Sequence, residues 1–330
     1  MIKSLIVAGA RYQPFGTFPA SSQTDDASSW DALSFPFSKN TQVSGVATDG
    51  SIVAIANQIG DLAITSDMSS FVHETVYPGL GIAGVGYNST RWLAAGTMLQ
   101  VLPYGPYPAN SEVAQIHISY TNATAWEMVW SHPNSGSRLE QLKWFPAGPV
   151  SPAVNAVPPA GIWMAVGNDN NRGDAWYSLD NGFSWTRANI PSGVGRIFSV
   201  MLVTIGDQPT WFWGCHGKLF SSLYLADGQW SQLSIDADST IVDMACDDES
   251  LVIVGQNKIY TSQDGIFLRP WSYPGYTFDR VGRVDQGVNS QWLVFARSHL
   301  TQYTHWLSTN LVNWEPGNMG IHVSAVAQNY

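Results

Sequence analysis

Carboxylates in this chain could supply the acid and the base of a glycoside hydrolase, which needs two opposed carboxyl groups with different pKa values. The chain has only six glutamates, and most of its aspartates stand at turn-like positions where we expect a structural role. Asp243 and Asp285 are exceptions, since they lie in or just after strand-like apolar runs. No spacing along the chain singles out two carboxylates as a catalytic pair. The sequence therefore neither supports nor excludes this chemistry, and we assign no catalytic residue.

Metal and thiol chemistry have weaker support. The seven histidines show no H-E-x-x-H spacing, and the pair Cys215-His216 stands alone. Acidic pairs at 236/238 and 247/248 could hold Ca²⁺, but plain turn chemistry is the better interpretation. Cys215 and Cys246 lie in or beside apolar runs and are expected to be small buried residues. No glycine-rich phosphate loop is present. We predict no metal and no cofactor.

Charge and composition narrow the partners. The net charge is −10 with five lysines, which disfavours a nucleic-acid partner. No segment approaches the roughly 20 apolar residues that span a bilayer, so we expect no membrane insertion. The apolar stretch within residues 1–8 is too short for a signal peptide and reads as a strand. Few charges (12%) and many aromatic residues predict one soluble all-β body rather than disorder.

One short apolar run recurs seven times, and its period decides the fold. The intervals between successive copies are 40 to 48 residues, except one of 71 that holds a Pro-rich insertion, residues 147–161. Its prolines favour a rigid surface loop over a docking arm. The copies are Leu5–Gly9, Ile52–Ala56, Trp92–Gly96, Trp163–Gly167, Trp211–Cys215, Leu251–Gly255 and Trp292–Ala296.

A second apolar segment, ending in a turn, precedes most of these runs. Val43–Ala47 before Asp49-Gly50 is one example, and Asp-Gly between two strands is a hairpin signal. The last such segment, His322–Ala327, lies at the C-terminus and has no run after it. Its expected partner is Leu5–Gly9 at the N-terminus. Pairing of the two ends closes a ring and removes the exposed sheet edges.

A turn with an aromatic anchor follows each run. Its clearest copy has Ser178, Asp180, Gly182 and Trp185 in the pattern S-x-D-x-G-x-x-W. Asp can accept hydrogen bonds from the turn's own amides, Gly supplies a positive φ, and the aromatic ring packs beside the hairpin. We therefore predict structural roles for these residues. The seven expected anchors are Trp30, Phe71, Trp126, Trp185, Trp230, Phe267 and Trp314.

The turn resembles the Asp-box (BNR repeat) of a propeller superfamily that includes the sialidases. In such families the boxes lie at the blade periphery, away from the active site. The repeat and this resemblance together predict an all-β, seven-bladed β-propeller of four-stranded antiparallel blades. The ring is expected to be closed by pairing of the N- and C-terminal strands, and residues 1–330 to form a single domain.

The resemblance also implies what an enzyme of this form would need. Sialidases use three arginines for the substrate carboxylate, a Tyr–Glu nucleophile pair and an acid/base Asp. The F-R-I-P motif of the first arginine is absent, and residues 10–14 match it only weakly. Sialidases also usually have six blades, whereas seven repeats are present here. Five arginines could reach a common face: Arg138, Arg172, Arg196, Arg269 and Arg280. A sialidase-like hydrolase stays the third hypothesis.

Strand order predicts where a ligand would bind. In a four-stranded blade, the loops joining strands 2–3 and those leading to the next blade share one face, here called the second face. Five loops rich in proline and aromatic residues fall there, at residues 11–19, 35–37, 77–79, 102–108 and 269–276. Such loops suit sugar stacking or a protein partner. The alternative is that the rings cover the blade ends as ordinary core. The candidate binding residues are Tyr12, Phe15, Phe18, Phe35, Tyr77, Tyr104, Tyr107, Arg269, Trp271, Tyr273 and Tyr276.

The leading hypothesis is a non-enzymatic virion or tail-associated propeller, made in the cytoplasm and working in the virion. It would dock on other virion or assembly proteins and contact a host-surface glycan or protein. Low charge with no visible export signal motivates this hypothesis, together with a similarity to phage accessory propellers that no diagnostic motif carries. The second hypothesis is a free lectin-like or protein-binding propeller. For localisation, the alternative is a cytoplasmic or non-classically exported protein.

Overall fold

The computed structural model of the chain describes most of its residues. The described ranges are 5–13, 16–24, 31–33, 37, 43–67, 69–99, 112–146, 161–205, 208–226, 229–236, 239–247, 250–284, 291–298, 303–318 and 322–328. No helix within these ranges is long and apolar enough to cross a membrane.

The described residues form four-stranded antiparallel sheets built from short strands. Six sheets each use four consecutive strands. They are β4 (Val43–Thr48), β5 (Val53–Asn57), β6 (Asp61–Thr65), β7 (Val72–Thr75); β8 (Leu80–Tyr87), β9 (Trp92–Leu99), β10 (Glu112–Ser119), β11 (Glu127–Ser131); β12 (Ser137–Phe145), β13 (Ile162–Asp169), β14 (Arg172–Ser178), β15 (Thr186–Arg187); β16 (Ile197–Ile205), β17 (Gln208–Cys215), β18 (Lys218–Ser222), β19 (Trp230–Leu233); β20 (Ile241–Cys246), β21 (Leu251–Gly255), β22 (Lys258–Ser262), β23 (Arg269–Trp271); and β24 (Tyr276–Val284), β25 (Gln291–Ser298), β26 (Tyr303–Ser308), β27 (Glu315–Asn318).

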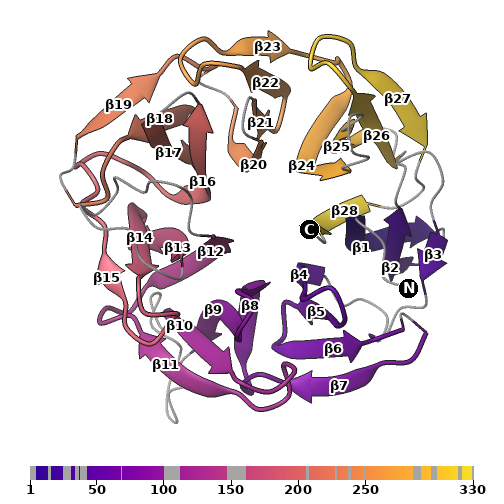
Figure 1. Ribbon diagram of the computed structural model, residues 1–330, viewed down its shortest axis with the longest axis vertical. Coiled ribbons are helices and arrows are strands. Elements are labelled where there is room, and N and C mark those ends of the chain that lie inside the picture. Colours follow the sequence, from indigo (N-terminus) through magenta and orange to yellow (C-terminus); the bar gives the residue numbers. More distant parts are fainter. Residues whose placement is uncertain are drawn as a thin grey trace.

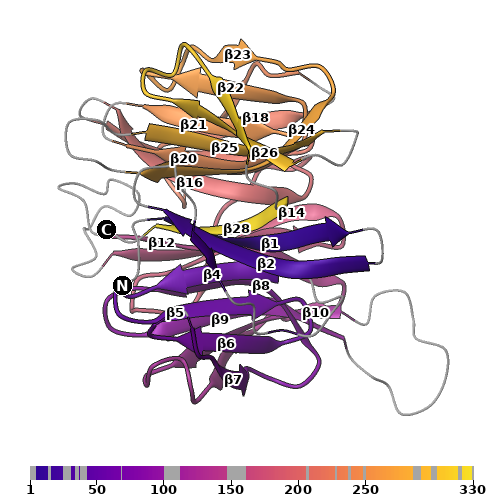
Figure 2. The ribbon, with the colours of Figure 1, turned by 90° about the vertical axis from the view of Figure 1, so that its right-hand side faces the viewer.

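The remaining sheet joins the two ends of the chain. Its order is β28 (His322–Gln328), β1 (Leu5–Gln13), β2 (Gly16–Thr24) and β3 (Asp31–Leu33). β1 pairs antiparallel with β28, from Leu5 opposite Gln328 to Ala10 opposite His322. Figure 2 shows β1 between β28 and β2. The predicted pairing of the termini is confirmed.

The sheets are the blades of a β-propeller. Their first strands line the centre, where each contacts the next in the order β4, β8, β12, β16, β20, β24, β28 and back to β4 (Figure 1). The propeller and its four-stranded antiparallel blades are therefore confirmed. The count of blades needs a correction, because the residues that the structure describes form six blades of one continuous segment each, not the seven blades that the repeat predicts. The other sheet is a composite, because β28 from the C-terminal end supplies its innermost strand and β1, β2 and β3 supply the other three.

The recurring apolar runs are the second strands of the blades. Every residue of β5 and of β21 is buried, because neighbouring blades cover both sides of each sheet. A strand buried on both sides is a continuous apolar run rather than an alternating one. Trp92, Trp163 and Trp211, which begin three of the runs, are almost fully buried. The repeat detected in the sequence is therefore the packing of blade against blade.

The glycine that ends several runs has a steric cause. A Cβ on Gly96 would lie 2.5 Å from the carbonyl oxygen of Gly81 on the first strand, and one on Gly167 would lie 1.9 Å from that of Arg138. Next to these contacts the pairing register of the first strand shifts by a β-bulge, as between Ile82 and Gly84. Only glycine permits so close an approach of the two backbones.

One predicted loop is mostly strand. Residues 11–19 were expected to form an aromatic loop, but β1 continues to Gln13 and β2 begins at Gly16, so the two strands pair almost to the turn. Tyr12 and Phe18 belong to these paired strands. Strands of nine residues extend the hairpin beyond its neighbours, which leaves two residues for the turn. The Pro-rich insertion lies outside the described residues except for Gly161.

Candidate functional site

The turn from Ser178 to Trp185 holds itself together by its own side chains. Asp180 Oδ1 accepts hydrogen bonds from Ser178 Oγ (2.8 Å) and from the Ser184 amide (2.9 Å). Gly182, with φ of 94°, donates its amide hydrogen to Ser178 Oγ at 2.8 Å, and Trp185 Nε1 donates to the Gly182 carbonyl at 3.0 Å. These bonds engage the carboxylate within its own turn, so Asp180 serves the fold.

The aromatic anchors of the related turns are not equivalent. Trp185 and Trp314 are buried, but Phe267 is 78% exposed, so the expectation that it packs beside its hairpin is wrong. The turn from Ser262 to Phe267 is two residues shorter than the Ser178 turn. Its Asp264 Oδ1 binds the Phe267 amide itself at 2.8 Å, which places the ring at the tip of the turn. Trp30 lies outside the described residues.

The central channel is crossed by a polar contact. Asp243, on β20, accepts hydrogen bonds from the amides of Met244 (2.9 Å) and Val281 (3.2 Å). Lys143 Nζ, on β12, lies 3.4 Å from Asp243 Oδ1 and donates to the Met244 carbonyl at 2.8 Å. The contacts of Lys143 join β12 to β20, the innermost strands of two blades that are not adjacent. Asp243 is thus a structural acceptor, and Asp285 lies outside the described residues.

The aromatic loop before β24 folds onto the core. Tyr273 stacks on Trp306 with ring centroids 3.7 Å apart, and Tyr276 meets the same ring edge-on at 5.6 Å. Arg269 and Trp271 were predicted in this loop but belong to strand β23, where Trp271 is half-buried and the exposed Arg269 lies over its ring at 4.8 Å. The rings of Tyr273 and Tyr276 therefore cover the end of a blade, as the alternative to a binding surface predicts.

The other predicted aromatic residues do not gather into one described surface. Tyr77 lies on the second face, 46% exposed, with its ring 5.4 Å from that of His117. Tyr12 and Phe18 are placed by their backbones only, in β1 and β2. Phe15, Phe35, Tyr104 and Tyr107 lie outside the described residues.

The arginines expected to reach the second face differ in the partners of their guanidinium groups. Arg138 pairs with Glu112 and Arg196 with Glu140, so two guanidinium groups are neutralised by neighbouring glutamates. Arg280 donates to the Asp279 carbonyl at 2.7 Å. Arg172 is exposed, and no described carboxylate lies within ion-pair distance of its guanidinium. Arg172 is also part of a pocket.

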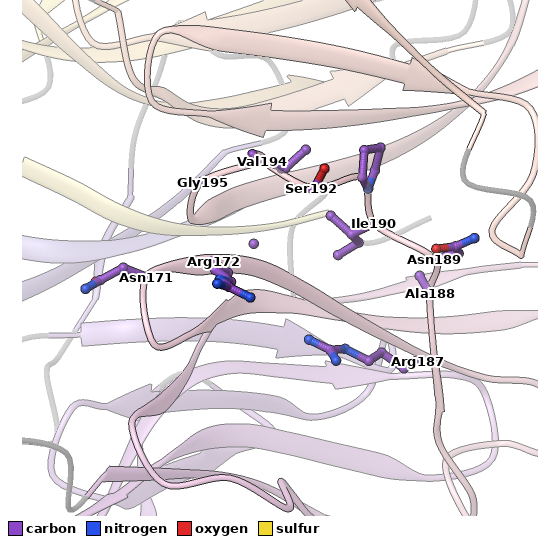
Figure 3. A pocket seen from close by; sticks show the side chains of 12 residues that line it. Asn171, Arg172, Arg187, Ala188, Asn189, Ile190, Ser192, Val194 and Gly195 are labelled. Atoms are coloured by element: carbon purple, nitrogen blue, oxygen red, sulfur yellow. The ribbon is translucent and has the colours of Figure 1, made fainter.

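That pocket lies on the second face, at the junction of two blades. Its volume is about 730 Å³, and its walls are residues 171–173 and 187–195. The first wall is the turn between β13 and β14, and the second is the segment from β15 to β16. Figure 3 shows the turn that carries Asn171 and Arg172 opposite the segment that carries Ile190, Ser192 and Val194. The first wall is thus a loop between strands 2 and 3 of a blade, and the second leads to the next blade. These are the two kinds of loop that share the second face.

Local sequence explains both walls. Asp169 pairs with Arg172 across a two-residue turn, in which Asn170 and Asn171 have φ of 49° and 68°. Asparagine tolerates this left-handed conformation, which the tight hairpin turn requires. In the opposite wall the Val194 amide donates to the Pro191 carbonyl at 3.4 Å and closes a turn. Gly193 supplies its positive φ of 89°.

Backbone hydrogen bonds hold the second wall against both blades. The Gly173 amide donates to the Val194 carbonyl at 2.9 Å, and the Asn189 amide donates to the Leu225 carbonyl at 2.8 Å. A Cβ at Gly193 or Gly195 would meet nothing within 4 Å, so both glycines border open space. Their amide hydrogens have no acceptor among the described residues.

A buried network fixes the second arginine of the pocket. Arg187 Nε donates to Asp174 Oδ1 at 2.7 Å, while Asp174 Oδ2 accepts from Trp176 Nε1 (2.6 Å) and lies 2.9 Å from His132 Nε2. Burial raises the pKa of the Asp174 carboxyl, but the bonds from His132, Trp176 and Arg187 outweigh burial and hold this pKa below its ordinary value. Arg187 is thus compensated, and Arg172 carries the uncompensated charge.

The described residues contain no group of three or more side chains that could hold a metal ion. Burial raises the pKa of the Cys215 thiol to about 12, which keeps it protonated and a poor nucleophile. The pocket walls contain no Asp, Glu, His or Cys. The pocket therefore offers charge and hydrogen bonds for binding.

The sequence places Arg172 among the arginines of the second face, but it does not predict the pocket. Three features of the sequence could have indicated the pocket. They are the Asn-Asn pair that suits a left-handed turn, the Gly- and Pro-containing segment Pro191–Gly195, and arginines at 172, 187 and 196 in a chain poor in basic residues. What the sequence did not show is that the two segments face each other, because this depends on how adjacent blades pack.

Comparisons with known proteins support the fold. No protein-family model matches the chain, and no curated protein matches it by sequence. Among solved structures, it is similar to YCF48 bound to D1 peptide, with a TM-score of 0.59, 13% identity, and coverage of 88% of this chain and 90% of the other. It also resembles the computationally designed Ika8 protein (TM-score 0.51, 10% identity, 86% and 90%) and a chain of the nidogen/laminin complex (0.51, 9%, 98% and 97%). At these identities the likeness shows the β-propeller fold alone.

Proposed function

We propose that this β-propeller is a non-enzymatic binding module that uses its second face, and that it works as a component of a virion or tail assembly in contact with a host-surface glycan. The observation that carries the binding role is the pocket between β13–β14 and β15–β16. A site of about 730 Å³ is of the size that holds small ligands. YCF48, a protein of similar fold, is described as bound to a peptide, which supports a binding role for a propeller of this shape.

Two features favour binding over hydrolysis. The pocket walls hold no carboxylate, whereas glycoside hydrolysis uses two. Asp243, an innermost-strand carboxylate, is engaged by two backbone amides and lies close to Lys143. A free lectin-like propeller would use the same pocket, and it differs from the leading proposal in having no assembly partner.

A glycan array probed with the full chain tests the binding role. We expect retention on at least one glycan class, together with no turnover of fluorogenic sialosides or β-glycosides. The variants Trp271→Ala and Tyr77→Ala test the aromatic loops, and Arg172→Ala tests the pocket. Retention that survives all three changes would remove this face from the proposal, and turnover of a glycoside would replace a binding module with a hydrolase.

The assembly role needs a separate observation. The virion proposal expects genes for capsid and tail proteins beside the gene for this chain, and the chain itself in purified particles. A gene that stands among sugar-utilisation genes, with the chain absent from particles, would favour the free lectin-like propeller.

A further inference from the structure

We infer that the pocket between β13–β14 and β15–β16 binds a sugar acid, a saccharide unit with one carboxylate, and that Arg172 is the residue that selects it. This inference rests on the proposed function, because it names the ligand class of the same site.

The charge of the pocket favours a single negative charge. The walls carry two arginines and no acidic residue, in a chain with 25 acidic and 15 basic residues. Asp174 compensates Arg187 from behind the wall. One guanidinium, that of Arg172, is left without a described counter-ion. A monoanion balances one such charge, whereas a doubly charged phosphate would exceed it.

The donors favour a carboxylate. A guanidinium presents two parallel N–H groups that match the two oxygens of a carboxylate. Across the pocket, the amides of Gly193 and Gly195 have no described acceptor, and space is open on the Cβ side of both residues. Neither glycine carries a side chain that would keep a ligand from the backbone. Arg172 and these amides can therefore approach one anionic group from two sides.

The remaining lining favours a hydroxyl-rich ligand. Asn171, Asn189 and Ser192 are exposed in the walls and offer both donors and acceptors, which sugar hydroxyls require. No aromatic ring lines the pocket. A neutral sugar that depends on ring stacking would therefore gain little here, and the affinity for a sugar acid would come from charge and hydrogen bonds.

Calorimetric titration of the full chain with galacturonic acid trimer, with the neutral galactose trimer as the matched ligand, tests the inference. We expect measurable binding of the acidic trimer only, weakened at least tenfold by Arg172→Ala and by raising the salt concentration from 0.05 to 0.5 M. Arg138→Ala removes an arginine of the same face that pairs with Glu112 outside the pocket, so it should bind like the parent chain. Unchanged thermal melts would show that both variants fold.

Four results would overturn the inference, and the last of them would also overturn the proposed function. Equal binding of the neutral trimer would show that the carboxylate is not recognised. Tighter binding of a tetraglutamate peptide than of any acidic saccharide, including a sialyl-lactose, would assign the site to a protein partner. If glycans bind but Arg172→Ala has no effect, the sugar-acid site fails while the binding module stands. If no glycan binds on the array at all, the glycan-binding function itself fails.

Discussion

Side chains of this propeller that resemble catalytic groups are mostly engaged in holding the fold. Asp174 receives hydrogen bonds from Trp176 and Arg187 and lies against His132, and its lowered pKa keeps it ionised at neutral pH. Because the folded carboxyl titrates below its unfolded value, its stabilising contribution is complete at neutral pH and is lost only as pH falls below about 4. Arg187 therefore stays in place at physiological pH. Arg172, without such a partner, is the residue free to act on a ligand.

Buried histidines make the stability of the molecule depend on pH. Burial lowers the pKa of His117 from 6.5 to about 4, and that of His305 by the same cause to about 4. The unfolded chain binds these protons near pH 6.5 and the folded chain does not. Stability is therefore fully present above pH 6.5 and falls as pH drops towards 4, by up to about 3 kcal/mol for each histidine.

Thermal melts between pH 7.5 and 4 would measure this decline. The variant His117→Gln removes one titrating group, so its melting temperature should fall about half as steeply with pH as that of the parent chain. Parallel pH profiles for the two proteins would contradict the role of His117.

At the scale of elements, the turn between the third and fourth strands is a small autonomous unit. Ser178 and Asp180 satisfy its amides, and the same pattern recurs where Ser308 Oγ accepts from the Leu311 amide at 2.9 Å and Asn310 Oδ1 from the Val312 amide at 2.9 Å. The hydrogen bonds recur, but burial of the aromatic ring does not. The turn is thus specified by its polar residues, and the anchor contributes only where the turn is long enough to reach the core.

Two substitutions separate these contributions. Trp185→Ala removes a buried ring from the core between the β8–β11 and β12–β15 blades and should cost about 3–5 kcal/mol. Phe267→Ala removes a ring that is 78% exposed and should change stability by no more than about 0.5 kcal/mol. Urea unfolding of both variants provides the measurement. A large loss for Phe267→Ala would show that its ring is packed after all.

At the scale of the whole molecule, the ring depends on contact between the chain ends. β28 is the innermost strand of a sheet whose other three strands come from the N-terminus, and it also contacts β4 and β24. Without β28, the inner edge of β1 would be unpaired and two neighbouring blades would lose a packing surface. An exposed edge of this kind invites pairing with other chains.

Deletion of residues 322–330 should therefore lower the melting temperature by well over 10 °C and promote self-association, which light scattering would detect. A synthetic peptide of residues 320–330 added in trans should restore part of the lost stability, whereas a scrambled peptide should not. A deletion variant that melts with the parent chain and stays monomeric would show that the closure does not stabilise the ring.

The sequence by itself determined the propeller, because its signals are local or periodic. Buried second strands must be continuous apolar runs, their terminal glycines permit close strand contact, and the polar turn residues satisfy their own backbone. The pairing of Leu5–Gly9 with the C-terminal segment also followed, since a ring leaves those strands no other partner. None of these features depends on how the side chains of one blade pack against the next blade.

Only the tertiary structure decided the candidate site. Whether Tyr273 stands free or stacks on Trp306 depends on how the blade end packs, and the sequence is the same in either case. The pocket likewise exists only because residues 171–173 and 187–195 come from different loops that adjacent blades bring together. Arg172 becomes distinctive when the other arginines find partners through the same packing. Charge compensation between distant segments is a property of the folded ring, so no spacing along the chain could reveal it.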